Sequence, residues 1–154
     1  MILPEQWVSE GEELCEPHVM ELPDGCLLGA FRIDKAGTMT IVTTRSRDGG
    51  RTWSVPERTG ICGGPPHLMR HSSGALILSY GRRAEPFGQR AAVSHDNGQS
   101  WSEEYVLDNC PESKDLGYAS TAELPDGSLI TVYYQRCPGD SFGSILYTKW
   151  NLGG

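Results

Sequence analysis

The sequence has few lysines, no closely spaced cysteines and no long apolar run. Its five cysteines are odd in number and form no Cys-x-x-Cys pair, which argues against a disulfide framework or a structural zinc site. No apolar stretch approaches the length of a membrane span, and the first residues lack the basic and apolar regions of a signal peptide. We therefore expect no metal, no cofactor and no membrane partner. As written the chain reads as cytoplasmic, or as secreted if it is a fragment of a longer protein.

Charge narrows the class of partner. The formal net charge of −7 argues against a nucleic-acid binder, which normally carries a basic face. Ten of the 13 basic residues are arginine, whose planar guanidinium suits carboxylates and phosphates. Codon usage alone would also explain that bias. A length of 154 residues gives room for one domain.

The sequence repeats itself three times. Each copy reads as a β-hairpin, a strand followed by a short turn ending in glycine and a second strand. The turn glycines Gly25, Gly74 and Gly127 are 49 and 53 residues apart. A third strand is expected after each hairpin, over residues 38–45, 89–93 and 144–150. This spacing is typical of β-propeller blades, which occupy roughly 40–50 residues. The sequence therefore predicts an all-β fold of about three four-stranded blades.

Two turns after the third strands share the pattern Ser-x-Asp-x-Gly-x-(Ser/Thr)-Trp, the Asp box, 48 positions apart. In such a turn the aspartate accepts hydrogen bonds from backbone N–H groups, the glycine takes a positive φ, and the tryptophan packs beside the turn. We interpret both as fold-stabilising. Their residues are Ser46, Asp48, Gly50 and Trp53 in one turn, and Ser94, Asp96, Gly98 and Trp101 in the other.

Blade topology predicts which face of the propeller carries chemistry. The hairpin turns and the Asp boxes should share one face, and the longer connections should lie on the other, where function usually sits. Arginines follow the second strand of each hairpin on that face, which predicts an anion site. Surface ion pairs with Glu85, Asp34 or Asp140 are the alternative. The candidate binding residues are Arg32, Arg82, Arg83, Arg90, Arg136, Asp115 and His67.

Tyr118 begins the innermost strand of the third repeat on the same face. A tyrosine there could stack on a sugar, pack in the core or act as a nucleophile. His18 and His67 begin the equivalent strands of the first two repeats. No Asp, Glu or His accompanies them at ligand spacing, so lining or packing is expected of them rather than metal binding.

Together these motifs resemble the sialidase (neuraminidase) superfamily, whose six-bladed propellers carry Asp boxes. Residues 15–152 are similar to the C-terminal half of bacterial sialidase-like proteins. The resemblance implies a substrate carboxylate held by arginines, and a tyrosine nucleophile activated by a glutamate in a retaining mechanism. Tyr118 stands at the matching position, and Glu123 is a candidate for the glutamate. The family's aspartate acid/base and its first arginine have no counterpart here.

The repeats predict a partial propeller. Residues 1–14 are expected to be a leftover outer strand of a preceding blade, residues 15–60 and 61–110 two blades, and residues 111–154 an incomplete last blade. Closed propellers have about four to eight blades. Either the chain is the C-terminal half of a longer protein, which we prefer, or two copies associate into a six-bladed ring.

Three functions remain open at this point. The leading one is a sialidase-like exo-glycoside hydrolase, acting on a terminal acidic sugar such as sialic acid. The second is a non-catalytic carbohydrate-binding propeller. The third is a related enzyme acting on uronic acid glycans, which would use the same arginines on a different carboxylate.

Overall fold

The computed structural model describes residues 10–153 and builds all of their regular structure from β-strands. Branched and aromatic residues fill these segments, and a Gly-containing turn ends most of them. In chain order the strands are β1 (Glu12–Glu21), β2 (Leu27–Lys35), β3 (Thr38–Ser46), β4 (Glu57–Cys62), β5 (His67–Arg70), β6 (Leu76–Arg82), β7 (Gly88–Ser94), β8 (Ser102–Asp108), β9 (Leu116–Glu123), β10 (Leu129–Gln135) and β11 (Ser144–Trp150). None of the described residues forms a helix that is long and apolar enough to cross a membrane.

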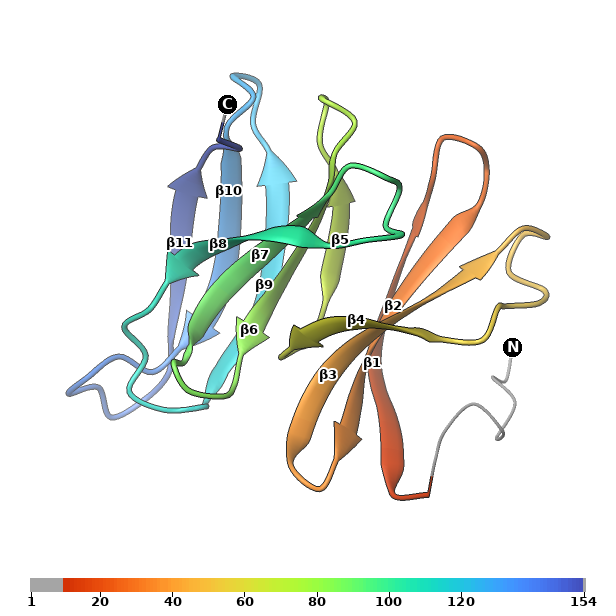
Figure 1. Cartoon of the computed structure of the whole chain (residues 1–154). Coiled ribbons are helices and arrows are strands. Elements are labelled where there is room, and N and C mark those ends of the chain that lie inside the picture. Colours follow the sequence, from red (N-terminus) through yellow and green to blue (C-terminus); the bar gives the residue numbers. More distant parts are fainter. Residues whose placement is uncertain (1–9, 154) are drawn as a thin grey trace.

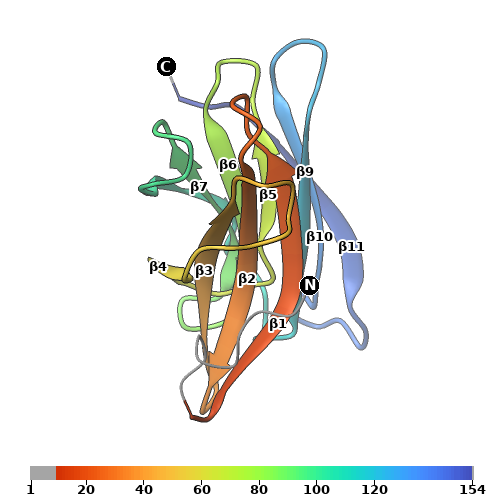
Figure 2. The same cartoon turned by 90° about the vertical axis from the view of Figure 1, so that its right-hand side faces the viewer.

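The strands form three antiparallel sheets (Figure 1). Two of them have four strands in the orders β1-β2-β3-β4 and β5-β6-β7-β8, and the third has three in the order β9-β10-β11. Each sheet is thus a meander in which sequential neighbours pair. The first strands of the sheets lie beside one another, since β5 contacts both β1 and β9 (Figure 2). The all-β fold of about three blades that the repeat predicts is confirmed.

The blade limits differ in detail from the predicted ones. The strand β1 begins at Glu12, so residues 12–14 belong to the innermost strand of the first blade and not to a leftover outer strand. Residues 1–9 of that expected strand lie outside the described residues. The first blade also ends later than residue 60, because β4 runs to Cys62. The last blade has no fourth strand within residues 10–153.

The core lies between the blades. Leu28 and Ile41 of the first blade pack with Leu76 and Leu78 of the second, and all four side chains are fully buried. Burying such a side chain contributes about 1.5–3 kcal/mol. A second cluster joins Ile77 and Ala91 of the second blade to Leu129 of the third. The blades therefore form one continuous packed body.

The two Asp boxes are closed by their own side chains. In the first, Ser46 donates a hydrogen bond to Asp48 (2.8 Å), and Asp48 also accepts from the hydroxyl of Thr52 (2.6 Å). The second repeats this pattern with Ser94, Asp96 and Ser100. These hydrogen bonds, with those from the turn backbone, hold the pKa values of both aspartates well below their usual range.

The remaining parts of each turn complete its structure. Gly50 and Gly98 have positive φ angles of 85° and 78°. The indole of Trp53 donates to the carbonyl of Gly50 at 3.1 Å, and the ring of Trp101 packs against the first hydrophobic cluster. These contacts fix how the third and fourth strands of each blade are joined. The turns lie at the same end of the molecule as the hairpin turns, and the β2–β3, β6–β7 and β10–β11 connections lie at the other (Figure 1).

Candidate functional site

Tyr118 lies near the start of β9, at the end of the molecule opposite the Asp boxes. Its φ of 52° is in the left-handed region, where a non-glycine residue is strained. The pairing of β9 with β10 shifts register beside it, between Val132 and Tyr134. This bulge turns the side chain out of the sheet, and 56% of the residue stays exposed.

Glu16 stands at the equivalent place in the first blade. It precedes Tyr118 by 102 residues, which is also the separation of the turn glycines Gly25 and Gly127, and its φ is likewise 52°. A register shift between Cys15 and His18 marks the same kind of bulge in β1. Two bulges thus place two side chains toward each other across β5.

The hydroxyl of Tyr118 donates a hydrogen bond to Oε1 of Glu16. The carboxylate stabilises the protonated hydroxyl and opposes a second negative charge beside it, so the hydrogen bond raises the pKa of Tyr118. Tyr118 is therefore a neutral phenol that has its proton acceptor already in place.

Arg32 lies on the other side of Glu16. Its guanidinium forms ion pairs with Glu16 Oε2 at 2.6 Å and with Asp34 at 2.9 Å, and only 12% of its side chain is exposed. Burial lowers the pKa of Arg32, but the carboxylates of Glu16 and Asp34 raise it by more, so the group is firmly charged. Its buried Nε has no hydrogen-bond partner among residues 10–153. Arg32 thus fixes the position of the Glu16 carboxylate and keeps one donor unused among the described residues.

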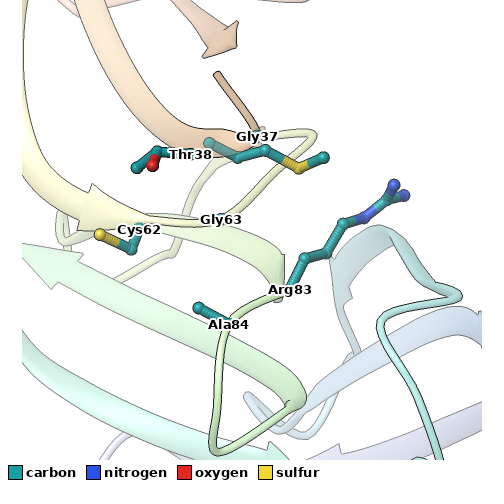
Figure 3. Close-up of a pocket in the computed structure, with 7 residues that line it drawn as sticks. Gly37, Thr38, Cys62, Gly63, Arg83 and Ala84 are labelled. Carbon is teal, nitrogen blue, oxygen red and sulfur yellow. The ribbon is translucent and has the colours of Figure 1, made fainter. Parts of the chain in front are cut away.

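Arg83 approaches the tyrosine from the second blade. Its Cζ lies 5.9 Å from the centre of the Tyr118 ring, within the range of a cation–π contact. A side chain on Gly117 would come within 3.0 Å of Nη2 of Arg83, so the glycine leaves room for this approach. Figure 3 shows Arg83 at the edge of a small recess of about 110 Å³ beside Gly37 and Cys62, with its guanidinium directed away from both. The buried Nε of Arg83 has no partner in the described part of the chain.

Tyr134 and Asp115 complete this end of the third blade. The hydroxyl of Tyr134 donates to Asp115 at 2.9 Å, and its ring lies 6.0 Å from that of Tyr118. Burial, together with the Asp115 carboxylate, raises the pKa of Tyr134. Asp115 is therefore engaged by Tyr134 rather than by an arginine.

A recess of about 400 Å³ opens next to Tyr118 and Glu16, and we call it the inner recess. Residues from the first strands of all three blades and from the loop before β5 line it. They are Glu16, Pro17, His18, Pro65, Pro66, His67, Tyr118, Ala119 and Ser120.

Three of the predicted arginines lie apart from this group. Arg90 is 3% exposed and donates hydrogen bonds to the carbonyls of Gln89 (2.9 Å) and Asp108 (2.7 Å). Arg82 contacts Glu104 and the carbonyl of Glu85. Arg136 contacts Glu112 and the carbonyl of Asp140. Arg90 is held inside the second blade, and the other two form ion pairs, but with Glu104 and Glu112 and not with Glu85 or Asp140. Of the ion-pair partners that the alternative interpretation names, only Asp34 pairs with an arginine among the described residues, and that arginine is Arg32.

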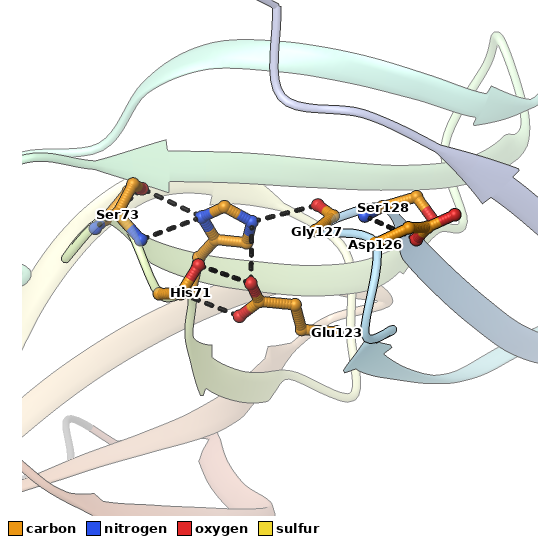
Figure 4. A network of polar contacts seen from close by, with 8 residues as sticks. His71, Ser73, Glu123, Asp126, Gly127 and Ser128 are labelled. Carbon is orange, nitrogen blue, oxygen red and sulfur yellow. Dashed lines mark hydrogen bonds and ion pairs between the residues drawn. The ribbon is translucent and has the colours of Figure 1, made fainter.

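Glu123 is not the partner of Tyr118. It ends β9, at the face that carries the hairpin turns, where its carboxylate accepts from the backbone and hydroxyl of Ser72 and lies 3.3 Å from Nε2 of His71 (Figure 4). The hydrogen bond from the hydroxyl of Ser72 lowers the pKa of Glu123 most strongly. This network links the hairpin turns of the second and third blades, so Glu123 has a structural role. The glutamate that accepts the hydrogen bond from Tyr118 is Glu16, which the sequence motifs do not single out.

The described residues contain no group of three or more His, Cys, Asp or Glu side chains that could hold a metal ion.

Comparisons with known structures agree with this architecture. A protein of unknown function from Dyadobacter fermentans DSM 18053 is 29% identical, with a TM-score of 0.84 over 95% of this chain and 40% of its own. The Hadza microbial sialidase Hz136 is 15% identical, with a TM-score of 0.64 over 90% of this chain and 35% of its own. An endo-arabinase from Bacteroides thetaiotaomicron VPI-5482 is 17% identical, with a TM-score of 0.67 over 94% of this chain and 58% of its own.

The chain therefore spans 35–58% of the length of these structures. The last two likenesses show a shared propeller fold. No curated protein matches the sequence. A family model described as BNR repeat-like domain matches residues 4–133. Since that match covers most of the sequence and both Asp boxes, the chain belongs to the BNR repeat-like domain family.

Proposed function

We propose that this chain supplies the nucleophile and the carboxylate-binding part of a retaining exo-glycoside hydrolase that acts on a terminal acidic sugar such as sialic acid. The observation that carries the proposal is the hydrogen bond from the Tyr118 hydroxyl to the Glu16 carboxylate, with Arg32 and Arg83 beside it. A nucleophile within hydrogen-bond reach of a base that a third group orients is the arrangement that covalent catalysis requires.

The chemistry follows from the charges at the site. A carboxylate nucleophile would be repelled by an anionic sugar, whereas the neutral phenol of Tyr118 is not. In the first step the Tyr118 oxygen forms a bond to the anomeric carbon, Glu16 accepts the phenolic proton, and the glycosidic C–O bond breaks. Water then attacks the anomeric carbon as the bond from that carbon to the Tyr118 oxygen breaks, Glu16 returns its proton to this oxygen, and the general acid that was deprotonated in the first step takes up the proton of the water.

The arginines hold the substrate in this proposal. Arg83 stands over Tyr118, and the Nε atoms of Arg83 and Arg32 have no hydrogen-bond partner among the described residues. Two guanidinium groups next to the nucleophile can bind a sugar carboxylate through charge-assisted hydrogen bonds. They also place the anomeric carbon, which is bonded to that carboxylate in sialic acid, close to the tyrosine oxygen.

The departing oxygen needs a proton from a general acid. We assign this role to a residue outside the three blades, consistent with a chain that spans 35–58% of the structures it resembles. The further blades that carry this residue would complete the ring, and they would come either from the same polypeptide or from a second copy. The catalytic unit in this proposal is the closed propeller.

Hydrolysis of 4-methylumbelliferyl sialoside by the full-length protein tests this function. We expect turnover that the Tyr118→Phe variant lowers by a factor on the order of 10²–10⁴ while its thermal unfolding is unchanged. Absent turnover, or turnover that is equal in the variant, would contradict the assignment. The same assay with a 4-methylumbelliferyl glucuronide distinguishes sialic acid from uronic acids as the source of the carboxylate.

A non-catalytic carbohydrate-binding propeller is the second candidate. The double ion pair of Arg32 with Glu16 and Asp34 favours it, because this arginine already has two carboxylate partners before a ligand arrives. This function predicts glycan binding without release of product. Binding of a sialylated glycan that Tyr118→Phe leaves intact, with no hydrolysis by either protein, would support it over the enzyme.

A further inference from the structure

Two histidines line the inner recess beside Tyr118. His18 lies in β1 and His67 begins β5, and their rings are 4.7 Å apart at an angle of 45°. Both are half-buried. Neither histidine takes part in the nucleophilic step proposed above, so a role other than catalysis has to account for their position beside Tyr118.

Each ring is tied to the next blade through the same atom. Nδ1 of His18 accepts a hydrogen bond from the backbone N–H of Leu68 at 3.2 Å. Nδ1 of His67 accepts from the backbone N–H of Thr121 at 3.3 Å. The contact thus runs from the first blade to the second and from the second to the third.

These contacts fix the chemical state of both rings. A backbone N–H only donates, so each Nδ1 must carry a lone pair, and the proton of the neutral ring must reside on Nε2. Protonating a ring would place an N–H on Nδ1 against the backbone donor. In agreement, burial lowers the pKa of His18, and burial with the nearby His18 lowers the pKa of His67 to about 4. Both rings are neutral N–H donors at physiological pH.

The same reasoning excludes two other roles. A metal ion would need a lone pair on Nε2, which this tautomer does not offer. A general base would need to take up a proton, which the Nδ1 contacts oppose. What remains is donation from Nε2, and within residues 10–153 neither Nε2 has a hydrogen-bond partner.

The surroundings indicate what the donors recognise. Pro17, Pro65, Pro66 and Ala119 are apolar lining residues of the recess. The charged groups Glu16 and Arg83 contact Tyr118. We propose that His18 and His67 form a fixed pair of neutral N–H donors that recognises an uncharged oxygen of the bound sugar, a hydroxyl or amide oxygen. This inference rests on the proposed sugar ligand and adds specificity residues to its site.

Two substitutions at His67 separate the ligand contact from the contact between blades. Asparagine places its Oδ1 where Nδ1 was, so His67→Asn keeps an acceptor for Thr121 and removes the Nε2 donor. Glutamine extends an amide N–H toward the position of Nε2, so His67→Gln keeps a donor and loses the interblade acceptor. Isothermal titration of the full-length protein with N-acetylneuraminic acid and with glucuronic acid measures the result.

We expect His67→Asn to weaken binding of one or both sugars by about 3- to 10-fold, the effect of one lost hydrogen bond, at an unchanged melting temperature. His67→Gln should bind with near wild-type affinity and melt lower. A His67→Asn protein that binds as tightly as wild type would overturn the inference while leaving the proposed function intact. Wild-type protein that binds neither sugar would overturn both.

The tautomers can be measured without any sugar. Side-chain ¹⁵N chemical shifts should show that Nδ1 is unprotonated and Nε2 protonated in both His18 and His67 between pH 7 and pH 8. A protonated Nδ1 in either ring within that range would overturn the inference, and so would Zn²⁺ binding that His67→Asn abolishes.

Discussion

The hydroxyl of Tyr118 donates a hydrogen bond to the carboxylate of Glu16, which occupies the same position of the repeat two blades earlier. Both residues have a φ of 52° and both lie at bulges of first strands. Equivalent positions of the first and third blades thus carry two different residues, and these are in contact. Strained backbone at both sites is the feature expected where a fold holds side chains for function.

Replacing Glu16 by glutamine should reduce activity without unfolding the protein. The amide can still contact the Tyr118 hydroxyl but cannot accept its proton, so kcat for an aryl sialoside should fall by a factor on the order of 10²–10⁴. Glu123→Gln is the matched control, since Glu123 lies at the opposite face in a structural network. Equal kcat in Glu16→Gln and wild type would remove Glu16 from the mechanism.

Arg83 and Arg90 should separate binding from stability. Arg83→Met removes a guanidinium next to Tyr118, so sugar affinity should fall by roughly 10- to 100-fold, the effect of losing a hydrogen bond from a charged group. Arg90→Met removes the buried donor to the carbonyl of the half-buried Asp108 and should lower the free energy of unfolding by about 1–3 kcal/mol. Urea unfolding and calorimetric titration of both variants measure the two effects. A loss of sugar affinity in Arg90→Met with a loss of stability in Arg83→Met would show that Arg90 belongs to the site.

The sequence predicts the blades well and the site only in part. Hairpin turns and Asp boxes are local features, so their residues reveal the strands and the two faces. Arg90 looks similar to Arg83 in sequence because the two stand at opposite ends of the connection that follows the second hairpin strand. Strand β7 is buried throughout its length, and only the fold shows that Arg90 points into it. The repeat does carry a signal for Glu16, because this residue stands 102 residues before Tyr118 in the same register, but no local motif marks it.

A methyl group at Gly98 should destabilise the protein more than one at Gly25. Both glycines have nearly the same φ, 78° and 79°, which costs an alanine about 1 kcal/mol. At Gly98 the new Cβ would also lie 2.9 Å from Leu28, whereas at Gly25 nothing lies within 4 Å. The crowding should add about 1–3 kcal/mol for Gly98→Ala. Equal melting temperatures of the two variants would mean that the Asp box does not pack on the first blade.

Stability should fall in mild acid because of His67. Its pKa is lowered from 6.5 to about 4 by burial and by His18, so the unfolded chain binds a proton that the folded chain resists. Stability from this group is complete above pH 6.5 and declines as the pH falls toward 4. The melting temperature of wild type, which should equal that of His67→Asn above pH 6.5, should therefore fall below it as the pH drops. Parallel curves over that range would contradict the lowered pKa.

The central claim is that Tyr118 is a nucleophile. A 3-fluorosialosyl fluoride carries a good leaving group and forms a slowly hydrolysed intermediate with a retaining enzyme, so mass spectrometry of the full-length protein after incubation tests the claim directly. We expect a glycosyl adduct on the peptide that contains Tyr118, with none in Tyr118→Phe. An adduct on a different residue, or turnover of the reagent with no adduct, would contradict it.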